Sequence, residues 1–455
     1  MKMLGKLSIV GLVTFALMQF VRPGIPTKTA TAEVQASPEV KRILEKDCYS
    51  CHSDQRRLSW FDQVVPGYWL VRYDILTARE HLNFSALGAK PAAAQKAALY
   101  EAVNMIQLGA MPLPAFVKLH PEAKVSPEDL ATLKAYLSPW TPALTYSDSL
   151  PGSTDAKTGG VLAPVSLGSV QQELNGFRFD PDFENWKLIS TTDRGDNNTF
   201  RFILGNDIAK KAVDSGNISP WPDGTRLAKI AWQQQLGSDG LVHPGKFIQV
   251  ELMLKDAHRY KSTDGWGWGR WRGLDLKPYG ANAGFVNECT GCHQPVRGND
   301  YVYTLPITMD VLNRDEVVNN SAASLPATLP YQPLTWNAIT MYVDRKVRTM
   351  ATLYGNRVAV EGAQMRGAAP LGGLQYPAGA VLALVTWVQR DDPHWFGARI
   401  PAMPESVEFV QVAAAQTTNN YRRFAGNGLM EERPATDVAA LRTKFMLGLT
   451  PVRLP

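Results

Sequence analysis

The chain has 455 residues, of which 45% are hydrophobic and 20% are charged. It is therefore long enough for roughly two to four globular domains with large cores. The formal net charge of +5 is modest, and no run of basic residues occurs, so the composition argues against nucleic-acid binding.

The first 32 residues have the layout of an export signal. Lys2 and Lys6 precede the apolar stretch Leu7 to Val21, and Ala30-Thr31-Ala32 offers a cleavage site of small residues. The apolar stretch is short for a membrane span, which needs about twenty residues. We predict a signal peptide over residues 1–32, with an uncleaved N-terminal anchor as the alternative. Both place the protein in the periplasm or outside the cell, and only the anchor brings it to the membrane.

All four cysteines belong to two Cys-x-x-Cys-His motifs, at residues 48–52 and 289–293. In this motif two thiols form thioethers with one haem, and the histidine next to them ligates the iron. A zinc half-site or a redox dithiol would leave that histidine unexplained twice. The motifs therefore predict two covalently bound haem c groups, with His52 and His293 as iron ligands. The predicted attachment residues are Cys48, Cys51, Cys289 and Cys292.

Residues 36–140 predict a helical c-type haem-binding domain. Apolar residues recur at helical spacing over residues 92–108, and Ser126 before Pro127 is a typical helix start. A second axial ligand is common in electron-transfer haems. Met111, followed by Pro112 in a loop between helices, is the first candidate, His120 is its rival, and neither residue is the third alternative.

Proline, glycine, serine and threonine are frequent in residues 141–172, which predicts a linker. Residues 173–310 then favour strands, with a strand-like run at 225–234 after the turn Asp223-Gly224 and another at 246–254. Residues 311–333 predict a second linker.

The final segment, residues 334–455, repeats features of the middle one. Leu204-Gly205-Asn206 corresponds to Tyr354-Gly355-Asn356, and the stretch 221–232 corresponds to 376–387. The alternative is chance similarity between strands. We interpret residues 334–455 as a degenerate repeat without a haem, because it has no Cys-x-x-Cys-His motif and Leu384 stands where the middle segment has Lys229.

Two charged residues of the middle segment stand out. Lys229 shares a strand face with Leu227 and Ala231, which is unusual for an ammonium group unless it is paired or has reacted. The alternative is a lysine whose charged end reaches the solvent. Glu251 shares a strand face with Gln249 and Lys255, so its pattern alone predicts a solvated strand face.

Residues 47–137 resemble a family of small periplasmic haem-binding domains. The resemblance rests on Asp47 to Ser53, Leu82 to Ser85, Met111-Pro112 and His120-Pro121. It implies electron transfer and does not imply a particular reaction.

The middle segment resembles the P-460 cytochromes, which are periplasmic enzymes that oxidise hydroxylamine. The matching residues are Pro222 to Thr225, Lys229, Gly245 to Phe247, Glu251, Lys255-Asp256, Cys289 to His293 and Asp300 to Thr304. The resemblance implies that Lys229 is covalently joined to a meso carbon of the haem. It also implies that Glu251 is a distal carboxylate with a catalytic role, while Asp300 and Tyr301 support the pocket.

We therefore expect a multidomain α+β protein, in which an all-α cytochrome c-like domain precedes two β-rich antiparallel-sheet domains of the P-460 or cytochrome c-prime-beta type. The expected activity is hydroxylamine oxidation at a five-coordinate haem held by His293. Electrons would then pass through the N-terminal haem to a periplasmic acceptor. The alternatives are a protein that binds nitric oxide or carbon monoxide, and a pure electron-transfer cytochrome.

Overall fold

A computed structural model of the chain describes residues 2–55, 57–138, 166–308, 318–368, 376–414 and 418–455. It divides into two compact units, residues 1–141 and residues 142–455. Most of the predicted linker 141–172, and residues 311–317 of the second one, lie outside the described residues.

The elements of the N-terminal unit, as far as they are described, are helical, in agreement with the predicted helical region. The α-helices of this unit are α1 (Lys2–Met18), α2 (Pro38–Asp47), α3 (Tyr49–His52), α4 (Gly67–His81), α5 (Phe84–Leu87), α6 (Ala92–Gln107), α7 (Pro114–Leu119) and α8 (Pro127–Leu137). Within the part of the chain that the structure describes, none of the helices has both the length and the apolar character needed to cross a membrane. The resemblance of this unit to a cytochrome c fold stays a prediction.

The predicted helix at 92–108 is confirmed as α6. The predicted start of α8 is also confirmed, because the Ser126 side chain accepts a hydrogen bond of 3.0 Å from the backbone N–H of Asp129. Asp129 in turn binds Arg42 and Lys46 of α2 at 2.9 and 3.2 Å. These contacts hold the helix that leads into the first Cys-x-x-Cys-His motif.

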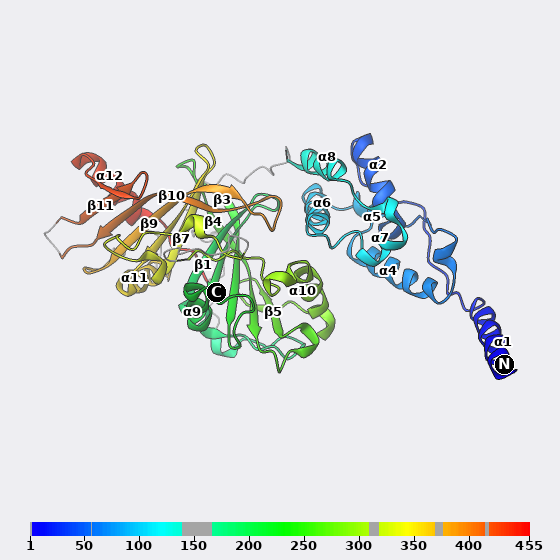
Figure 1. Cartoon of the computed structure of the whole chain (residues 1–455). Coiled ribbons are helices and arrows are strands. Elements are labelled where there is room, and N and C mark those ends of the chain that lie inside the picture. Colours follow the sequence, from blue (N-terminus) through cyan, green and yellow to red (C-terminus); the bar gives the residue numbers. More distant parts are fainter. Residues whose placement is uncertain (1, 56, 139–165, 309–317, 369–375, 415–417) are drawn as a thin grey trace. The chain divides into compact units, whose positions relative to one another are not determined.

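The second unit is built on one antiparallel sheet (Figure 1). Its strands are β1 (Lys187–Arg194), β2 (Thr199–Gly205), β3 (Arg226–Leu236), β4 (Val242–Lys255), β5 (Trp266–Arg272), β6 (Lys277–Pro278), β7 (Asn337–Asp344), β8 (Thr349–Gly355), β9 (Val381–Asp391), β10 (Ala398–Gln411), β11 (Asn420–Ala425) and β12 (Met430–Glu432). Its α-helices are α9 (Asp207–Ser215), α10 (Val286–His293), α11 (Arg357–Ala368) and α12 (Thr436–Gly448). The β-rich region is confirmed, and both predicted strands are present as β3 and β4.

The order β1-β2-α9-β3-β4 recurs as β7-β8-α11-β9-β10. The repeated pairs Gly205-Asn206 and Gly355-Asn356 explain why a helix follows the second strand in each half. A Cβ on Gly205 would lie 2.8 Å from the Cβ of Ala209, and a Cβ on Gly355 would lie equally close to Ala359, so each helix approaches the end of its strand because glycine is there.

The asparagines that follow these glycines also have the same contacts. Asn206 accepts a hydrogen bond from the backbone N–H of Ala209, and Asn356 accepts one from Ala359. Both side chains therefore cap the helix that follows a strand. These matching contacts support the interpretation of residues 334–455 as a repeat.

The two halves of the sheet share one hydrophobic core. β4 pairs with β7 and β1 pairs with β10, and Trp232 and Trp387 are fully buried in the same cluster. The indole of Trp232 donates to the carbonyl of Arg453 and that of Trp387 donates to Ala323, each at 2.9 Å. Residues 142–455 therefore form one compact unit, and its division into two domains stays an interpretation.

Candidate haem sites

Both histidines of the Cys-x-x-Cys-His motifs have the same hydrogen-bonding geometry. The Nδ1 of His52 lies 2.9 Å from the carbonyl oxygen of Leu82, and the Nδ1 of His293 lies 2.7 Å from that of Tyr301. A carbonyl only accepts, so Nδ1 carries the proton and Nε2 keeps a lone pair for a metal.

Burial also keeps both imidazoles neutral. It lowers the pKa of His52, and it lowers the pKa of His293 to about 4. A neutral imidazole with a fixed tautomer is the form that ligates haem iron. The structure describes all four cysteines and joins none of them in a disulfide, so all four are available for thioether bonds.

In the N-terminal unit the two candidates for the sixth ligand differ in their contacts. His120 is buried, its Nε2 lies 2.9 Å from Asp62, and its Nδ1 lies 3.3 Å from Glu122. Both ring nitrogens of His120 are thus engaged by carboxylates. Met111 lies in the loop between α6 and α7, where the sequence placed it. These contacts favour Met111, which stays a prediction.

In the second unit, three adjacent strands align a row of charged residues. Lys229 on β3 is paired with Glu251 on β4, and Glu251 is paired with Arg270 on β5. The Nζ of Lys229 lies 2.6 Å from a carboxylate oxygen of Glu251, and the Nε of Arg270 lies 3.5 Å from the other. Only 26% of the Lys229 side chain and 15% of the Glu251 side chain are exposed. The solvated face that the pattern of Glu251 predicted is therefore wrong.

The burial and the charges of this row shift the pKa values of its members. Burial lowers the pKa of Lys229 to about 8, against the opposing effect of the Glu251 charge. Burial alone would raise the pKa of Glu251, but the positive charges of Lys229, Arg270 and Arg201 outweigh it and lower that pKa to about 2. The pair therefore combines a lysine that loses its proton readily with a firmly ionised carboxylate.

This charged row lies next to the second haem motif. The charges of Lys229, Glu251 and Arg270 all act on the ring of His293, and they also act on the thiol of Cys289. Cys289 packs in a cluster of buried apolar side chains beside the row, which contains Leu227, Trp266, Trp268 and Phe285. The ring of Trp268 meets that of His293 edge-on at 4.6 Å.

Asp300 and Tyr301 support this pocket through several bonds. Asp300 accepts from Lys255 at 2.7 Å and from the backbone N–H of Trp221 at 2.9 Å. The hydroxyl of Tyr301 donates to Asp264 at 2.6 Å. Asp300 and Tyr301 adopt left-handed backbone angles with φ of 45° and 66°, which aim the Tyr301 carbonyl at His293.

Arg201, Arg270 and Tyr303 also belong to this site, although the sequence pattern assigned no role to them. Arg201 on β2 is opposite Ala231 on β3, and burial lowers its pKa to about 9. Tyr303 lies edge-on to the ring of His293 at 5.1 Å. Alternation along β2 and β5 could have shown which face each arginine occupies. Only the pairing of the strands brings them to Glu251.

The residues of the second unit fit a haem. Among the described residues, the buried donors of this region without a hydrogen-bond partner include the Nε atoms of Arg201 and Arg270 and the indole nitrogens of Trp221 and Trp268. A haem carries two propionate carboxylates, which are acceptors for such donors. His293 would hold the iron, and Cys289 and Cys292 would attach the porphyrin.

The corresponding place in the other half of the sheet is filled by protein. Leu384 on β9 is paired with Glu408 on β10, as Lys229 is with Glu251. Glu408 is bound by Arg442 of α12 at 2.6 and 2.8 Å. The apolar residues around Leu384 pack against Met446 and Leu449, at the end of α12. The absence of a haem from this half stays a prediction, and the packing of α12 supports it.

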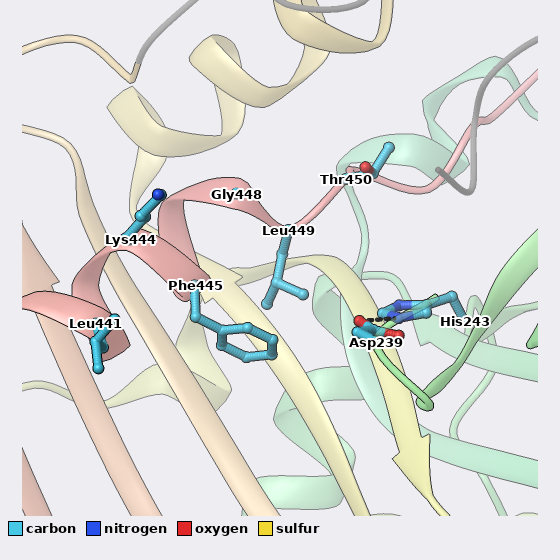
Figure 2. A pocket seen from close by; sticks show the side chains of 8 residues that line it. All are labelled: Asp239, His243, Leu441, Lys444, Phe445, Gly448, Leu449 and Thr450. Carbon is cyan, nitrogen blue, oxygen red and sulfur yellow. Dashed lines mark hydrogen bonds and ion pairs between the residues drawn. The ribbon is translucent and has the colours of Figure 1, made fainter. Parts of the chain in front are cut away.

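A pocket of about 340 Å³ lies beside α12. Figure 2 shows Leu441, Lys444 and Phe445 of α12 along it, with the hydrogen-bonded pair Asp239 and His243 across from them. None of the charged residues near His293 lines this pocket, so it is separate from the candidate haem site.

Comparison with known families identifies both parts of the chain. Residues 11–139 match the model of a haem-binding domain, and residues 180–304 match that of cytochrome P460. The chain joins a haem-binding domain to a cytochrome P460 domain. The P460 match contains Lys229, Glu251 and the second Cys-x-x-Cys-His motif, and the haem-binding match contains the first. No curated protein matches the chain.

The contact between Arg442 and Glu408 predicts a measurable effect on stability. The Arg442→Ala substitution leaves a carboxylate that is only 3% exposed without its cation, which costs about 3 kcal/mol. The control is Arg357→Ala, because Arg357 pairs with Glu361 on the surface and its loss costs less than about 0.5 kcal/mol. Urea unfolding followed by circular dichroism measures both variants. Equal stability of the two variants would contradict this account of α12.

Proposed function

We propose that this protein is an exported dihaem c-type cytochrome that oxidises hydroxylamine at the haem of its P460 domain. His52 and Met111 would hold the iron of the N-terminal haem, which would supply electron transfer to a periplasmic acceptor. The observation that carries the proposal is the ion pair between Lys229 and Glu251, 2.6 Å long, beside His293 in the segment that matches cytochrome P460.

The first step concerns Lys229. Only a neutral amine is a nucleophile, and a pKa of about 8 leaves about a tenth of the Lys229 amine neutral at pH 7. The amine lies on the same sheet face as the residues that pack around Cys289. Lys229 is thus placed to be the residue bonded to a meso carbon of a porphyrin attached through Cys289 and Cys292, as the resemblance to the P-460 cytochromes implies. That bond replaces one N–H bond and the meso C–H bond, and the two electrons released would go to an oxidant of the peroxide class.

The second step concerns Glu251. Hydroxylamine oxidation releases protons, and a carboxylate near the substrate is a suitable base. A carboxylate with a pKa of about 2 is a weak one, and the ammonium of Lys229 contributes to that low value. A Lys229 nitrogen bonded to the porphyrin no longer carries this charge. Loss of this charge raises the pKa of Glu251, and the carboxylate becomes a stronger base.

The haem, when bound, supplies an iron that accepts electrons from the nitrogen substrate. The protein supplies the rest of the site. His293 would hold the iron, and Glu251 would accept protons. Arg201 and Arg270 keep positive charge near the Glu251 carboxylate. The apolar cluster around Cys289 excludes water.

The bond between Lys229 and the haem can be tested by mass spectrometry of the digested holoprotein. We expect the haem peptide containing residues 289–293 to be joined to a peptide in which trypsin has not cleaved after Lys229. The Lys229→Ala variant should keep its haem on the two cysteines alone. Lys246 is exposed on the neighbouring strand, so Lys246→Ala is the control and should retain the joined peptide. A wild-type haem peptide without Lys229 would contradict the bond and favour a gas-binding protein.

The role of Glu251 predicts a pH dependence. Since only the ionised carboxylate accepts protons, kcat/KM for hydroxylamine should fall as the pH drops through the pKa of Glu251. In the enzyme with a bonded Lys229 we expect this fall well above pH 2. Glu251→Gln should lower kcat/KM about 100-fold and remove this part of the profile. A glutamine variant within threefold of the wild type, with the same profile, would exclude Glu251 as the base.

A further inference from the structure

The haemless half of the sheet reaches the iron ligand of the P460 domain through one loop. This loop, residues 392–397, connects β9 to β10 and is called the 392–397 loop below. It contacts Tyr303, which follows the second Cys-x-x-Cys-His motif by ten residues and lies against His293.

The side chain of Tyr303 contacts two residues of the second Cys-x-x-Cys-His motif. Its hydroxyl donates a hydrogen bond of 2.6 Å to the carbonyl oxygen of Cys292. Its ring meets the ring of His293 edge-on, with 5.1 Å between the centroids and an angle of 77°. The ring of Trp268 contacts the same histidine, with 4.6 Å between the centroids. The rotation of the His293 ring therefore depends on the position of Tyr303.

The 392–397 loop fixes the position of Tyr303 with two side chains. The Nδ1 of His394 lies 2.7 Å from the backbone carbonyl oxygen of Tyr303, so the imidazole donates to it. The indole of Trp395 packs edge-on against the Tyr303 ring at 5.6 Å. One residue therefore holds the backbone of Tyr303 and the next holds its ring.

The loop is itself anchored to the first half of the sheet. The Arg194 guanidinium lies over the Trp395 ring at 4.3 Å, and its Nε donates to Asp196 at 2.6 Å. Asp196 also accepts from the Trp395 indole at 3.3 Å. Arg194 and Asp196 are each 4% exposed, so this arrangement is buried and has a defined geometry.

We propose that the 392–397 loop of the haemless half positions the iron ligand His293, with Tyr303 as the positioning residue between them. The proposal rests on the proposed function only in so far as a haem is bound at His293. It gives the haemless half a role at the site, because a ligand held by neighbouring side chains keeps its ring orientation and its basicity. Both properties affect the potential of the iron.

The test uses the full-length holoprotein with His394→Gln and Trp395→Ala. Resonance Raman spectra of the reduced protein report the iron–histidine stretching band, and redox titration reports the midpoint potential of each haem. We expect both variants to shift the band of the P460 haem. We also expect the midpoint potential of the P460 haem to shift by about 28 mV. For one electron, this shift is about a threefold change in the ratio of oxidised to reduced haem at the wild-type midpoint. The midpoint potential of the N-terminal haem, in the same molecule, should be unchanged.

Two further variants separate positioning from a general loss of packing. Trp336 is another partly buried tryptophan of this half, with its ring against Tyr331, and Trp336→Ala should leave the band and the potential at wild-type values. Trp395→Phe keeps a ring in place and should restore most of the wild-type signal. If Trp395→Ala does not fold, His394→Gln decides the question, because it leaves Trp395 in place.

Wild-type band and potential in both His394→Gln and Trp395→Ala would overturn the proposal. An equal effect of Trp336→Ala would also overturn it. Failure of the proposed function is a different result, namely a wild-type P460 haem that binds no carbon monoxide when reduced. In that case the midpoint potential, which needs no open iron position, still tests whether the loop acts on His293.

Discussion

The antiparallel pairing of β3 with β4 sets the arrangement of charged residues at the candidate haem site of the second unit. It sets Lys229 opposite Glu251, and the next pairing adds Arg270. A shift of one residue in either strand would turn the lysine or the carboxylate to the opposite face of the sheet. The side chains in register form a charged group that is largely shielded from water. This shielding lowers the pKa of Lys229, and the neighbouring cations keep Glu251 ionised.

The two halves of the sheet have the same strand pairing but different side chains around the paired glutamate. Each half pairs a residue of one strand with a glutamate of the next, Lys229 with Glu251 and Leu384 with Glu408. In the first half the glutamate faces a lysine beside the haem motif. In the second it is bound by Arg442 of α12, and apolar side chains of that helix fill the space. In the second half, α12 therefore packs at the place that corresponds to the predicted haem of the first half.

Much of the fold could be predicted from local sequence signals. Ser126 and the glycine-asparagine pairs mark helix starts, and the two Cys-x-x-Cys-His motifs locate both candidate haem sites because their chemistry is local. The pattern around Glu251 gave the wrong environment, since alternation shows that residues share a face but not what covers it. Arg201, Arg270 and Tyr303 were missed for a related reason. Their roles depend on strand pairing and on the 392–397 loop, about ninety residues after Tyr303.

The proposed function requires two different haems in this chain, one ordinary c-type group and one whose porphyrin is bonded to Lys229. The visible absorption spectrum of the dithionite-reduced holoprotein distinguishes the two groups. We expect a strongly red-shifted Soret band beside an ordinary c-type band, and the loss of the shifted band in the Lys229→Ala variant. Two ordinary c-type bands in the wild-type protein would contradict it.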